Sequence, residues 1–297
     1  MSEIKLFEVG EKTKELVSST VVLEKELQTV IEDNMETFFG VRFLKSEYVI
    51  SNGRMDSIGI DENNSPVIFE YKRSINENVI NQGLFYLDWL LDHKADFKLL
   101  VIEKFGVKVA EQIDWSVPCV ICIANDFTRY DLHAVNQMQR NIKLVKYRKY
   151  GNELILFEHL NTPFIQQTNE TSSTATISSN TQKSHMEKLA CVNNNISSLY
   201  KSLCRYIESL GDDLVPNQLK LYLAYKKSQN VFCIEVYNKQ IFLRMKLSPD
   251  TVILEEGFTR DTRGIGHYGT GDLEVSIKTE DDFQKAKPLI DRAYNES

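Results

Sequence analysis

Three residues whose types suit hydrolytic chemistry, Asp56, Glu70 and Lys72, flank one turn-forming stretch of the sequence. The stretch at 61–65 reads DENNS, which is typical of a turn between two strands. If the hairpin is symmetric about Asn63, positions that sum to 126 face each other, so Asp56 lies opposite Glu70. Because strand side chains alternate between the two faces of a sheet, Asp56, Glu70 and Lys72 share one face.

Two facing carboxylates need something to offset their charges. Directly opposed side chains have Cβ atoms about 4.5–5.5 Å apart, so the charges repel unless one group takes a proton or a cation sits between them. Mg²⁺ or Mn²⁺ fits, because hard divalent ions prefer carboxylate and carbonyl oxygens, and the backbone carbonyl of Tyr71 can add a ligand. Lys72 can position or deprotonate a water and stabilise phosphate charge, which suits phosphodiester hydrolysis. The alternative is an ordinary salt-bridge cluster, with Asp56 paired to Arg54 and Glu70 to Lys72.

Two further polar residues stand on predicted helices that can reach the same site. With about 100° per residue, Glu24 lies at the border of its helix's apolar stripe, whereas Glu26 and Glu32 point further away. Glu24 can therefore reach over the edge of the sheet as a metal ligand. Gln82 shares a helix face with Tyr86 and can hold a water or the metal. The alternatives are a first-turn acid that favours the helix dipole and a plain polar face.

Several basic residues are candidates for contact with nucleic acid. A run at 143–150 interleaves basic residues with two tyrosines, Tyr147 and Tyr150, that can stack on bases. The candidates for phosphate contact are Arg54, Arg73, Lys143, Lys146 and Arg148. A solvated edge strand guarded by lysines explains the same run equally well.

The elements that must position these residues form an α/β pattern in the N-terminal half. Hydrophobic periodicity predicts helices at 20–39 and 77–92 and strands at 41–51, 53–61, 66–73, 97–105 and 118–124. In the first helix the predicted apolar stripe is Leu23, Leu27, Val30, Ile31 and Phe38. A closing hairpin is expected over Gly151-Asn152, from strands at 143–150 and 153–160. This order predicts a mixed sheet flanked by helices.

The chain is expected to hold two domains, at 1–162 and 186–297, joined by a flexible Ser/Thr-rich linker at 163–185. Ten of the 19 residues at 166–184 are Ser or Thr, so that stretch cannot bury enough apolar surface to fold. The C-terminal half has an α+β pattern with a long helix at 186–210, ended by Gly211, and a last helix capped by Thr279. Its strands are expected at 219–226, 231–237, 240–247 and 272–278.

Composition excludes several classes of protein. The net charge is −7, divided as −6 for 1–165 and −1 for 166–297, which excludes a polybasic coat for nucleic acid but leaves room for a local basic groove. No run approaches the roughly 20 apolar residues of a membrane span, and the N-terminus lacks the apolar core of a secretory signal. With five cysteines in 297 residues, a disulfide scaffold is not expected. We therefore expect a reduced, cytoplasmic protein.

The motifs together resemble the PD-(D/E)XK nucleases, and more closely the nuclease domain of the NucS branch. The resemblance covers about 20–125 and rests on Glu24, the GRxD strand with Asp56, the ExK strand with Glu70 and Lys72, and Gln82 followed by the Tyr86/Trp89 helix. It implies a restriction-endonuclease-like core with metal-dependent DNA cleavage at these residues. NucS proteins carry a DNA-binding and dimerising domain before the nuclease, whereas this chain starts at the nuclease helix. The C-terminal domain, with GHYGTGDLEV at 266–275, resembles a small nuclease-associated domain of unknown function.

These observations lead to the prediction of a Mg²⁺- or Mn²⁺-dependent endonuclease that acts on DNA. Cutting both strands of a duplex would suit a homodimer. Two alternatives stay open at this point. The first is a catalytically inactive nuclease fold that binds nucleic acid. The second is a protein-interaction protein with no nucleic-acid role, which the negative charge of both halves favours.

Overall fold

The computed structural model describes residues 4–19, 24–72, 79–138, 140–161, 183–265 and 267–297. The chain divides into two compact units, Met1–Gln166 and Gln167–Ser297. Most of the predicted linker and the candidate Arg73 lie outside the described residues. No helix in the described part of the chain is long and apolar enough to cross a bilayer.

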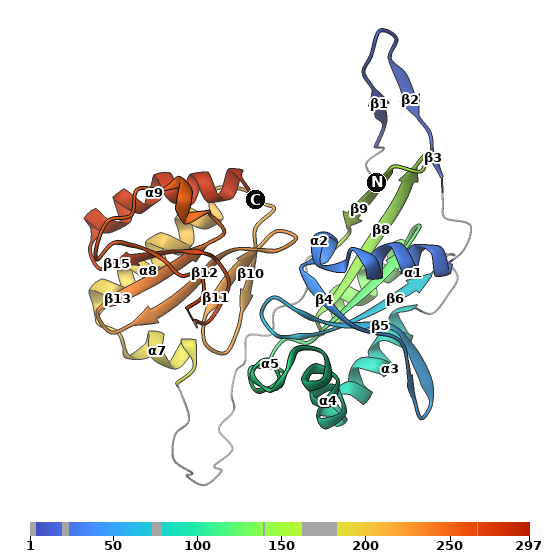
Figure 1. Cartoon of the computed structure of the whole chain (residues 1–297), viewed down its shortest axis with the longest axis horizontal. Helices are drawn as coiled ribbons and strands as arrows, with labels where there is room; N and C mark the ends of the chain where they lie inside the picture. The colour runs from blue at the N-terminus through green and yellow to red at the C-terminus, as the bar shows by residue number, and fades with distance from the viewer. Residues whose placement is uncertain (1–3, 20–23, 73–78, 139, 162–182, 266) are drawn as a thin grey trace. The chain divides into compact units, whose positions relative to one another are not determined.

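The N-terminal unit is built on a mixed sheet in the order β3-β8-β7-β6-β5-β4, with β9 paired to β8 (Figure 1). The neighbours β6, β7 and β8 are parallel, and the remaining pairs are antiparallel. The strands of this sheet are β3 (Ser18–Ser19), β4 (Val41–Ile50), β5 (Gly53–Asp61), β6 (Pro66–Lys72), β7 (Cys119–Ala124), β8 (Ile142–Tyr150) and β9 (Leu154–His159). A separate ribbon is formed by β1 (Leu6–Glu8) and β2 (Lys14–Leu16).

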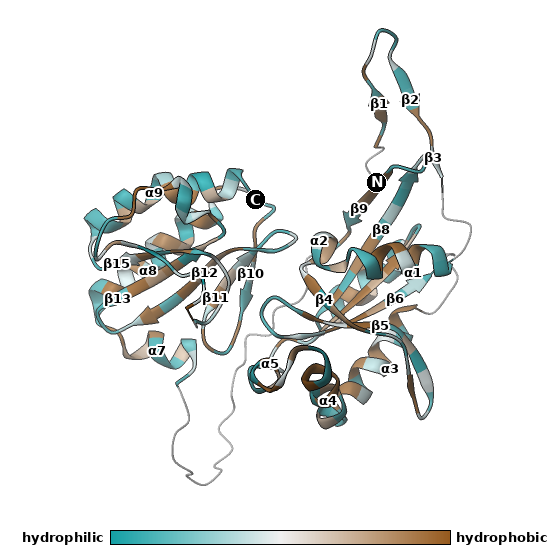
Figure 2. Ribbon diagram, viewed as in Figure 1, coloured by the Kyte–Doolittle hydropathy of each residue, from teal (hydrophilic) through white to brown (hydrophobic). Residues whose placement is uncertain are grey.

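Helices cover both faces of this sheet, because alternate residues of its central strands are apolar on each side. One core contains Ile31, Phe69 and Ile121, and the other contains Ile68, Leu87 and Val120. The first belongs to the face covered by α1 (Glu24–Asp33) and α2 (Met35–Phe39). The second belongs to the face covered by α3 (Val79–Asp92), α4 (Lys94–Phe105), α5 (Val107–Glu111) and α6 (Arg129–Gln137). Figure 2 shows the hydrophobic residues gathered along the central strands.

The predicted α/β class with flanking helices is confirmed, but two elements differ from prediction. The segment 97–105 is not a strand; it forms the main part of α4, in which Phe97 and Val101 are buried one turn apart. Leu99, which strand alternation would bury with them, is 57% exposed. The first helix is broken at Asn34, and Val30 of its predicted stripe is 38% exposed.

The C-terminal unit is an antiparallel sheet in the order β10-β11-β12-β13-β15-β14, with α8 and α9 packed on one face. Its strands are β10 (Val215–Gln218), β11 (Leu223–Lys226), β12 (Asn230–Tyr237), β13 (Gln240–Met245), β14 (Thr259–Asp261) and β15 (Leu273–Ile277). Its helices are α7 (His185–Cys191), α8 (Asn194–Glu208), α9 (Glu280–Asn295) and the short 3₁₀ turn η1 (Pro249–Thr251).

The long helix expected at 186–210 is two helices, because the Asn193 side chain accepts a hydrogen bond from the Ile196 amide and starts α8. The second helix ends at Glu208, before Gly211. The strand expected at 219–226 is β11 alone, with its first half in the turn after β10. The predicted capping box of the last helix is confirmed, since the side chain of Thr279 accepts from the Asp282 amide.

A buried histidine predicts acid sensitivity of the C-terminal unit. His185 is fully buried, and burial, followed by the charge of Lys188, lowers its pKa to about 4. The unfolded histidine titrates near 6.5, so between about pH 4 and pH 6.5 the chain takes up this proton on unfolding. We expect the free energy of unfolding to be about 2 kcal/mol lower at pH 5 than at pH 7, measured by urea unfolding. His185→Gln should flatten this slope; a slope equally flattened by His133→Gln, an exposed histidine, would contradict it.

Candidate active site

The hairpin that carries the candidate carboxylates has the predicted register. Ile58 pairs with Ile68 and Ile60 with Pro66, so paired positions sum to 126. The turn is held by Asp61, whose carboxylate accepts from the amides of Asn63 and Ser65 at 2.9 and 2.8 Å. This is the local side-chain bonding that makes Asp favourable in turns. The main-chain ladder between β5 and β6 ends at the pair Ser57 and Phe69, one position before Asp56.

Asp56 is paired in neither of the ladders that flank β5. On one side the next pair would be Asp56 and Glu70, where β5 and β6 separate. On the other side, β4 pairs through Ser46 with Ser57 and through Tyr48 with Met55, and skips Glu47. Glu47 has a φ of +49°, a left-handed conformation that is uncommon outside glycine. The peptide groups of Asp56 are therefore free to bond to side chains.

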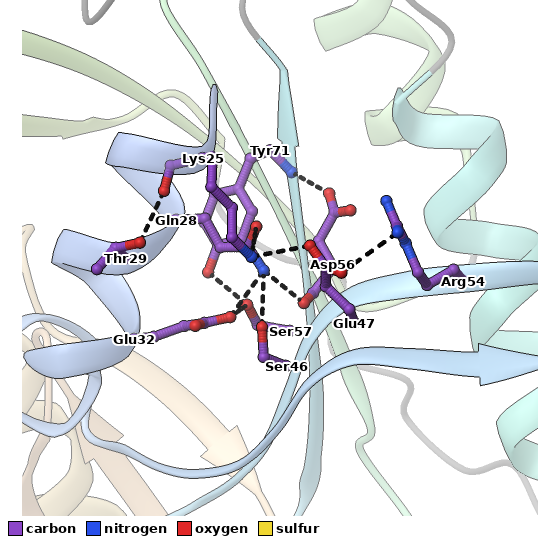
Figure 3. Close-up of polar contacts among 10 residues, drawn as sticks. All are labelled: Lys25, Gln28, Thr29, Glu32, Ser46, Glu47, Arg54, Asp56, Ser57 and Tyr71. Atoms are coloured by element: carbon purple, nitrogen blue, oxygen red, sulfur yellow. Dashed lines mark hydrogen bonds and ion pairs between the residues drawn. The ribbon is translucent and has the colours of Figure 1, made fainter. Parts of the chain in front are cut away.

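The two carboxylates are each oriented by a main-chain amide of the opposite strand. The amide of Asp56 donates to Glu70 Oε1 at 3.3 Å, and the amide of Tyr71 donates to Asp56 Oδ2 at 3.0 Å. Figure 3 shows the Asp56 carboxylate directed at the Tyr71 amide. Glu70 is 1% exposed, and Asp56 is half-buried. Both acids thus lie where the hairpin strands diverge, with fixed orientations.

Burial raises the pKa of both acids. It raises the pKa of Glu70 to about 9, and the charge of Asp56 acts in the same direction. It also raises the pKa of Asp56, against the lowering effects of the Tyr71 amide and the Lys72 charge. A hydrogen bond between the two carboxyl groups raises the pKa of Glu70 and lowers that of Asp56. Without a cation, Glu70 is the group that carries the proton at neutral pH.

Lys72 and Glu24 lie beside this pair. The Lys72 ammonium is 3.7 Å from Glu24 Oε1, and the Lys72 side chain is only 14% exposed. Glu24 is the first residue of α1, a helix that packs on the other face of the sheet. Its side chain nevertheless reaches Lys72 at the end of β6, as predicted. The structure therefore brings Glu24, Lys72, Glu70 and Asp56 to one end of the hairpin.

Gln82 is placed in the first turn of α3, where it is exposed, and it makes no hydrogen bond to Asp56, Glu70 or Lys72 in the described structure. Tyr86, one helical turn after Gln82 on α3, contacts the GRxD strand instead. The Tyr86 hydroxyl accepts from the Arg54 amide at 3.4 Å. A Cβ on Gly53 would lie 2.8 Å from the Tyr86 ring, which explains the glycine of the GRxD strand.

The close approach of α3 to the sheet depends on Gly83. A Cβ there would lie 2.5 Å from Val120 Cγ1 on β7. Gly83→Ala should lower the free energy of unfolding by up to about 2 kcal/mol, because overpacking costs about 1–3 kcal/mol and the helix propensity of alanine returns about 1 kcal/mol. Urea unfolding measures this. In the control Gly10→Ala the added Cβ meets nothing within 4 Å; equal stability of the two variants would refute the clash.

Two of the basic candidates, Arg54 and Lys146, form ion pairs. Arg54 lies 3.2 Å from Glu47, and Lys146 lies 2.7 Å from Asp126. Ala124 of β7 is in register with Lys72 on one side and with Lys146 on the other. The two lysines therefore lie on the same face of the sheet, two strands apart. Lys143 and Arg148 are half-buried on β8. The expectation that the two tyrosines of this strand stack on bases is wrong, because Tyr147 and Tyr150 are 1% and 4% exposed.

The donor set suits a hard cation with few protein ligands. In the described residues no group of three or more His, Cys, Asp or Glu side chains could hold a metal ion. Mg²⁺ usually keeps several waters and binds proteins through one or two carboxylates. Half-buried Asp56 and buried Glu70 are converging carboxylates, and burial, which raises the pKa of both, disfavours two uncompensated negative charges there. These residues therefore fit Mg²⁺ or Mn²⁺ with water completing the shell.

Sequence reasoning missed the polar residues behind the site. Gln28 is buried and donates to the Asp56 carbonyl at 2.8 Å. Glu32, expected to point away, accepts from Ser57 at 2.6 Å and from Gln28 at 2.8 Å. The available signal was spacing, since Gln28 and Glu32 follow Glu24 at intervals of one helical turn.

Comparisons with known proteins show distant sequence similarity. No protein-family model matches the chain. A protein of Haemophilus influenzae, described as uncharacterized, is 29% identical over 282 residues, which cover 92% of this chain and 93% of that protein. Two solved structures also show similarity: a repair endonuclease from Pyrococcus abyssi at 18% identity, and an EndoMS–dsDNA complex at 16%. The alignments cover 45% and 48% of this chain, and 51% and 64% of those chains, each with a TM-score of 0.29. A TM-score of 0.29 is too low to establish a shared fold.

Proposed function

We propose that the N-terminal unit is a metal-dependent endonuclease, with a restriction-endonuclease-like core, that hydrolyses phosphodiester bonds in DNA. One observation carries the proposal: Asp56 and Glu70 converge, largely buried, where two strands separate, with the Lys72 ammonium beside them. Surface salt-bridge clusters do not require buried carboxylates that face each other. Hydrolytic sites for phosphodiesters do combine acidic metal ligands with a cation that offsets phosphate charge.

In this proposal each residue has a defined role. Asp56 and Glu70, with the Tyr71 carbonyl, would hold Mg²⁺ or Mn²⁺, and Glu24 would complete the acidic site. The ion, when bound, would supply Lewis-acid polarisation of the phosphate and a nucleophilic water at neutral pH. Lys72 would orient that water and offset the developing charge. Gln82 would orient water from α3.

Recognition of DNA would involve the remaining candidates. Arg54, Arg73, Lys143, Lys146 and Arg148 would contact phosphates, which requires Arg54 and Lys146 to exchange their acidic partners for the backbone of DNA. The C-terminal unit would bind a partner, which can be nucleic acid or a second subunit. A homodimer would allow cleavage of both strands in a duplex. A cytoplasmic location is part of the same proposal.

A catalytically inactive nucleic-acid-binding module is the second candidate. Two observations favour it. In the described residues no group of three or more His, Cys, Asp or Glu side chains could hold a metal ion, and the basic candidates Arg54 and Lys146 are paired with acids. Such a module would bind DNA without metal, and the salt dependence of binding would report the phosphates contacted.

The test is a cleavage assay of the full chain with Mg²⁺, Mn²⁺ or EDTA on linear duplex, single-stranded, mismatched and flapped DNA. Asp56→Ala and Lys72→Ala are compared with Asp92→Asn, a change at an exposed carboxylate at the end of α3. Metal-dependent cutting that only the first two variants lose supports the enzyme. Salt-sensitive binding in EDTA without cutting supports the inactive module, and wild-type cleavage by Asp56→Ala would overturn the assigned site.

A further inference from the structure

The main-chain groups of Asp56 are bonded to side chains in place of neighbouring strands. Its amide donates to Glu70, and its carbonyl accepts from Gln28 Nε2 at 2.8 Å. A buried peptide group left unpaired costs about as much as a lost hydrogen bond. The two strands can therefore diverge at the carboxylates only because side chains replace the missing ladder. Gln28 does so from α1, the helix on the other face of the sheet.

These contacts close into a ring that joins α1, β5 and β6 (Figure 3). The Tyr71 hydroxyl donates to Ser57 Oγ at 3.1 Å, and Ser57 donates to Glu32 Oε1 at 2.6 Å. Gln28 donates to the same Glu32 oxygen and to the Asp56 carbonyl. The ring closes through the Tyr71 amide, which donates to the Asp56 carboxylate. One partly buried circuit thus fixes the peptide and the carboxylate of Asp56 together.

The amide of Gln28 can be oriented in only one way within this ring. Its Oε1 accepts from the Lys25 ammonium at 3.2 Å, so its Nε2 must face the acceptors on Glu32, Ser46 and Asp56. A carboxylate at position 28 would place an oxygen against the Asp56 carbonyl and a like charge against Glu32. The position therefore requires a neutral group that is both donor and acceptor, which is the chemistry of an amide.

We propose that Gln28 is a positioning residue for the active site: it holds the Asp56 peptide where the strands separate and thereby aims the Asp56 carboxylate at the metal position. The proposal rests on the proposed function and extends it to a residue that touches neither metal nor substrate. Partners that orient metal ligands typically contribute 10–100-fold to metal affinity or activity. An effect of that size should follow the loss of the Gln28 amide.

The experiment compares Gln28→Leu and Gln28→Glu with Thr29→Ala in the full chain. Thr29 is the exposed neighbour of Gln28, and its hydroxyl bonds only to the Lys25 carbonyl of the same helix. Mn²⁺ affinity is read from the electron paramagnetic resonance signal of free Mn²⁺, and single-turnover cleavage gives the rate. Both Gln28 variants should bind Mn²⁺ about 10–100-fold more weakly and cleave correspondingly slower, with the KM for DNA unchanged. Thr29→Ala should match wild type.

Amide hydrogen exchange separates this proposal from the proposed function. In EDTA, Gln28→Leu should speed exchange at the Tyr71 amide about tenfold or more, because that amide depends on the aimed carboxylate. If wild type neither binds Mn²⁺ nor cleaves, the proposed function fails while this exchange measurement still decides the role of Gln28. Wild-type Mn²⁺ affinity in folded Gln28→Leu, or unchanged exchange at Tyr71, would overturn the proposal. A general loss of stability with unchanged Mn²⁺ affinity would also overturn it.

Discussion

Replacing Glu70 with glutamine is expected to stabilise the metal-free protein at pH 8 by a few kcal/mol, while removing metal-dependent cleavage. Folded Glu70 keeps its proton up to a pKa of about 9, whereas the unfolded side chain loses it near 4.5. Between these values unfolding releases a proton, so the free energy of unfolding falls as the pH rises. Each pKa unit corresponds to about 1.4 kcal/mol. A glutamine carries no such proton and can still accept from the Asp56 amide.

The measurement is urea unfolding in EDTA at pH 5 and pH 8. The gap between Glu70→Gln and wild type should be large at pH 8 and below about 1 kcal/mol at pH 5, which lies only slightly above the pKa of the unfolded side chain. The matched control is Glu111→Gln, at an exposed acid of α5, which should follow wild type at both values. Added Mn²⁺ should stabilise wild type and leave Glu70→Gln unchanged. Equal stabilities at pH 8 would mean that Glu70 does not carry the proton.

Replacing Lys72 with methionine is expected to slow single-turnover cleavage by about 10²–10³-fold, the size typical of removing one stabiliser of developing charge. The Lys72 side chain is 14% exposed and lies beside Glu24. Methionine keeps most of the aliphatic stem and removes only the charge. Because the lost interaction acts mainly in the transition state, the apparent affinity for DNA should change much less than the rate.

Lys146→Met provides the matched control for this substitution. Lys146 lies on the same face of the sheet, in register with Lys72 across β7, and is likewise little exposed. A phosphate contact there would change affinity and its salt dependence, with a rate at saturating DNA close to wild type. The assignment of Lys72 fails if Lys146→Met slows the saturated rate as much as Lys72→Met does.

The hairpin could be predicted from the sequence because its information is local. The turn residues Asp61, Asn63 and Ser65 set the register through bonds within five positions, and strand alternation then fixes which side chains share a face. Asp56, Glu70 and Lys72 could therefore be placed together before any tertiary structure was known. The capping box at Thr279 was readable for the same reason.

The features that sequence could not supply depend on contacts between distant elements. In α4, the alternation of apolar residues favours a strand, and only the burial of Phe97 and Val101 against the sheet selects the helix. The role of Gln28 requires knowledge that β5 and β6 separate at Asp56, which is a property of the sheet and not of either strand. The left-handed φ of Glu47 has no signal in residue type, because glutamate rarely adopts it.

The left-handed conformation of Glu47 also affects how copies of this protein can associate. β4 is an outer strand of the N-terminal sheet, and a straight outer strand would offer unpaired amides and carbonyls to any other extended chain. The left-handed residue interrupts this row in its middle, and the charges of Lys25 and Arg54 surround it. These features disfavour growth of the sheet from one molecule into the next along this edge. The homodimer of the proposed function is accordingly expected to form through a different surface.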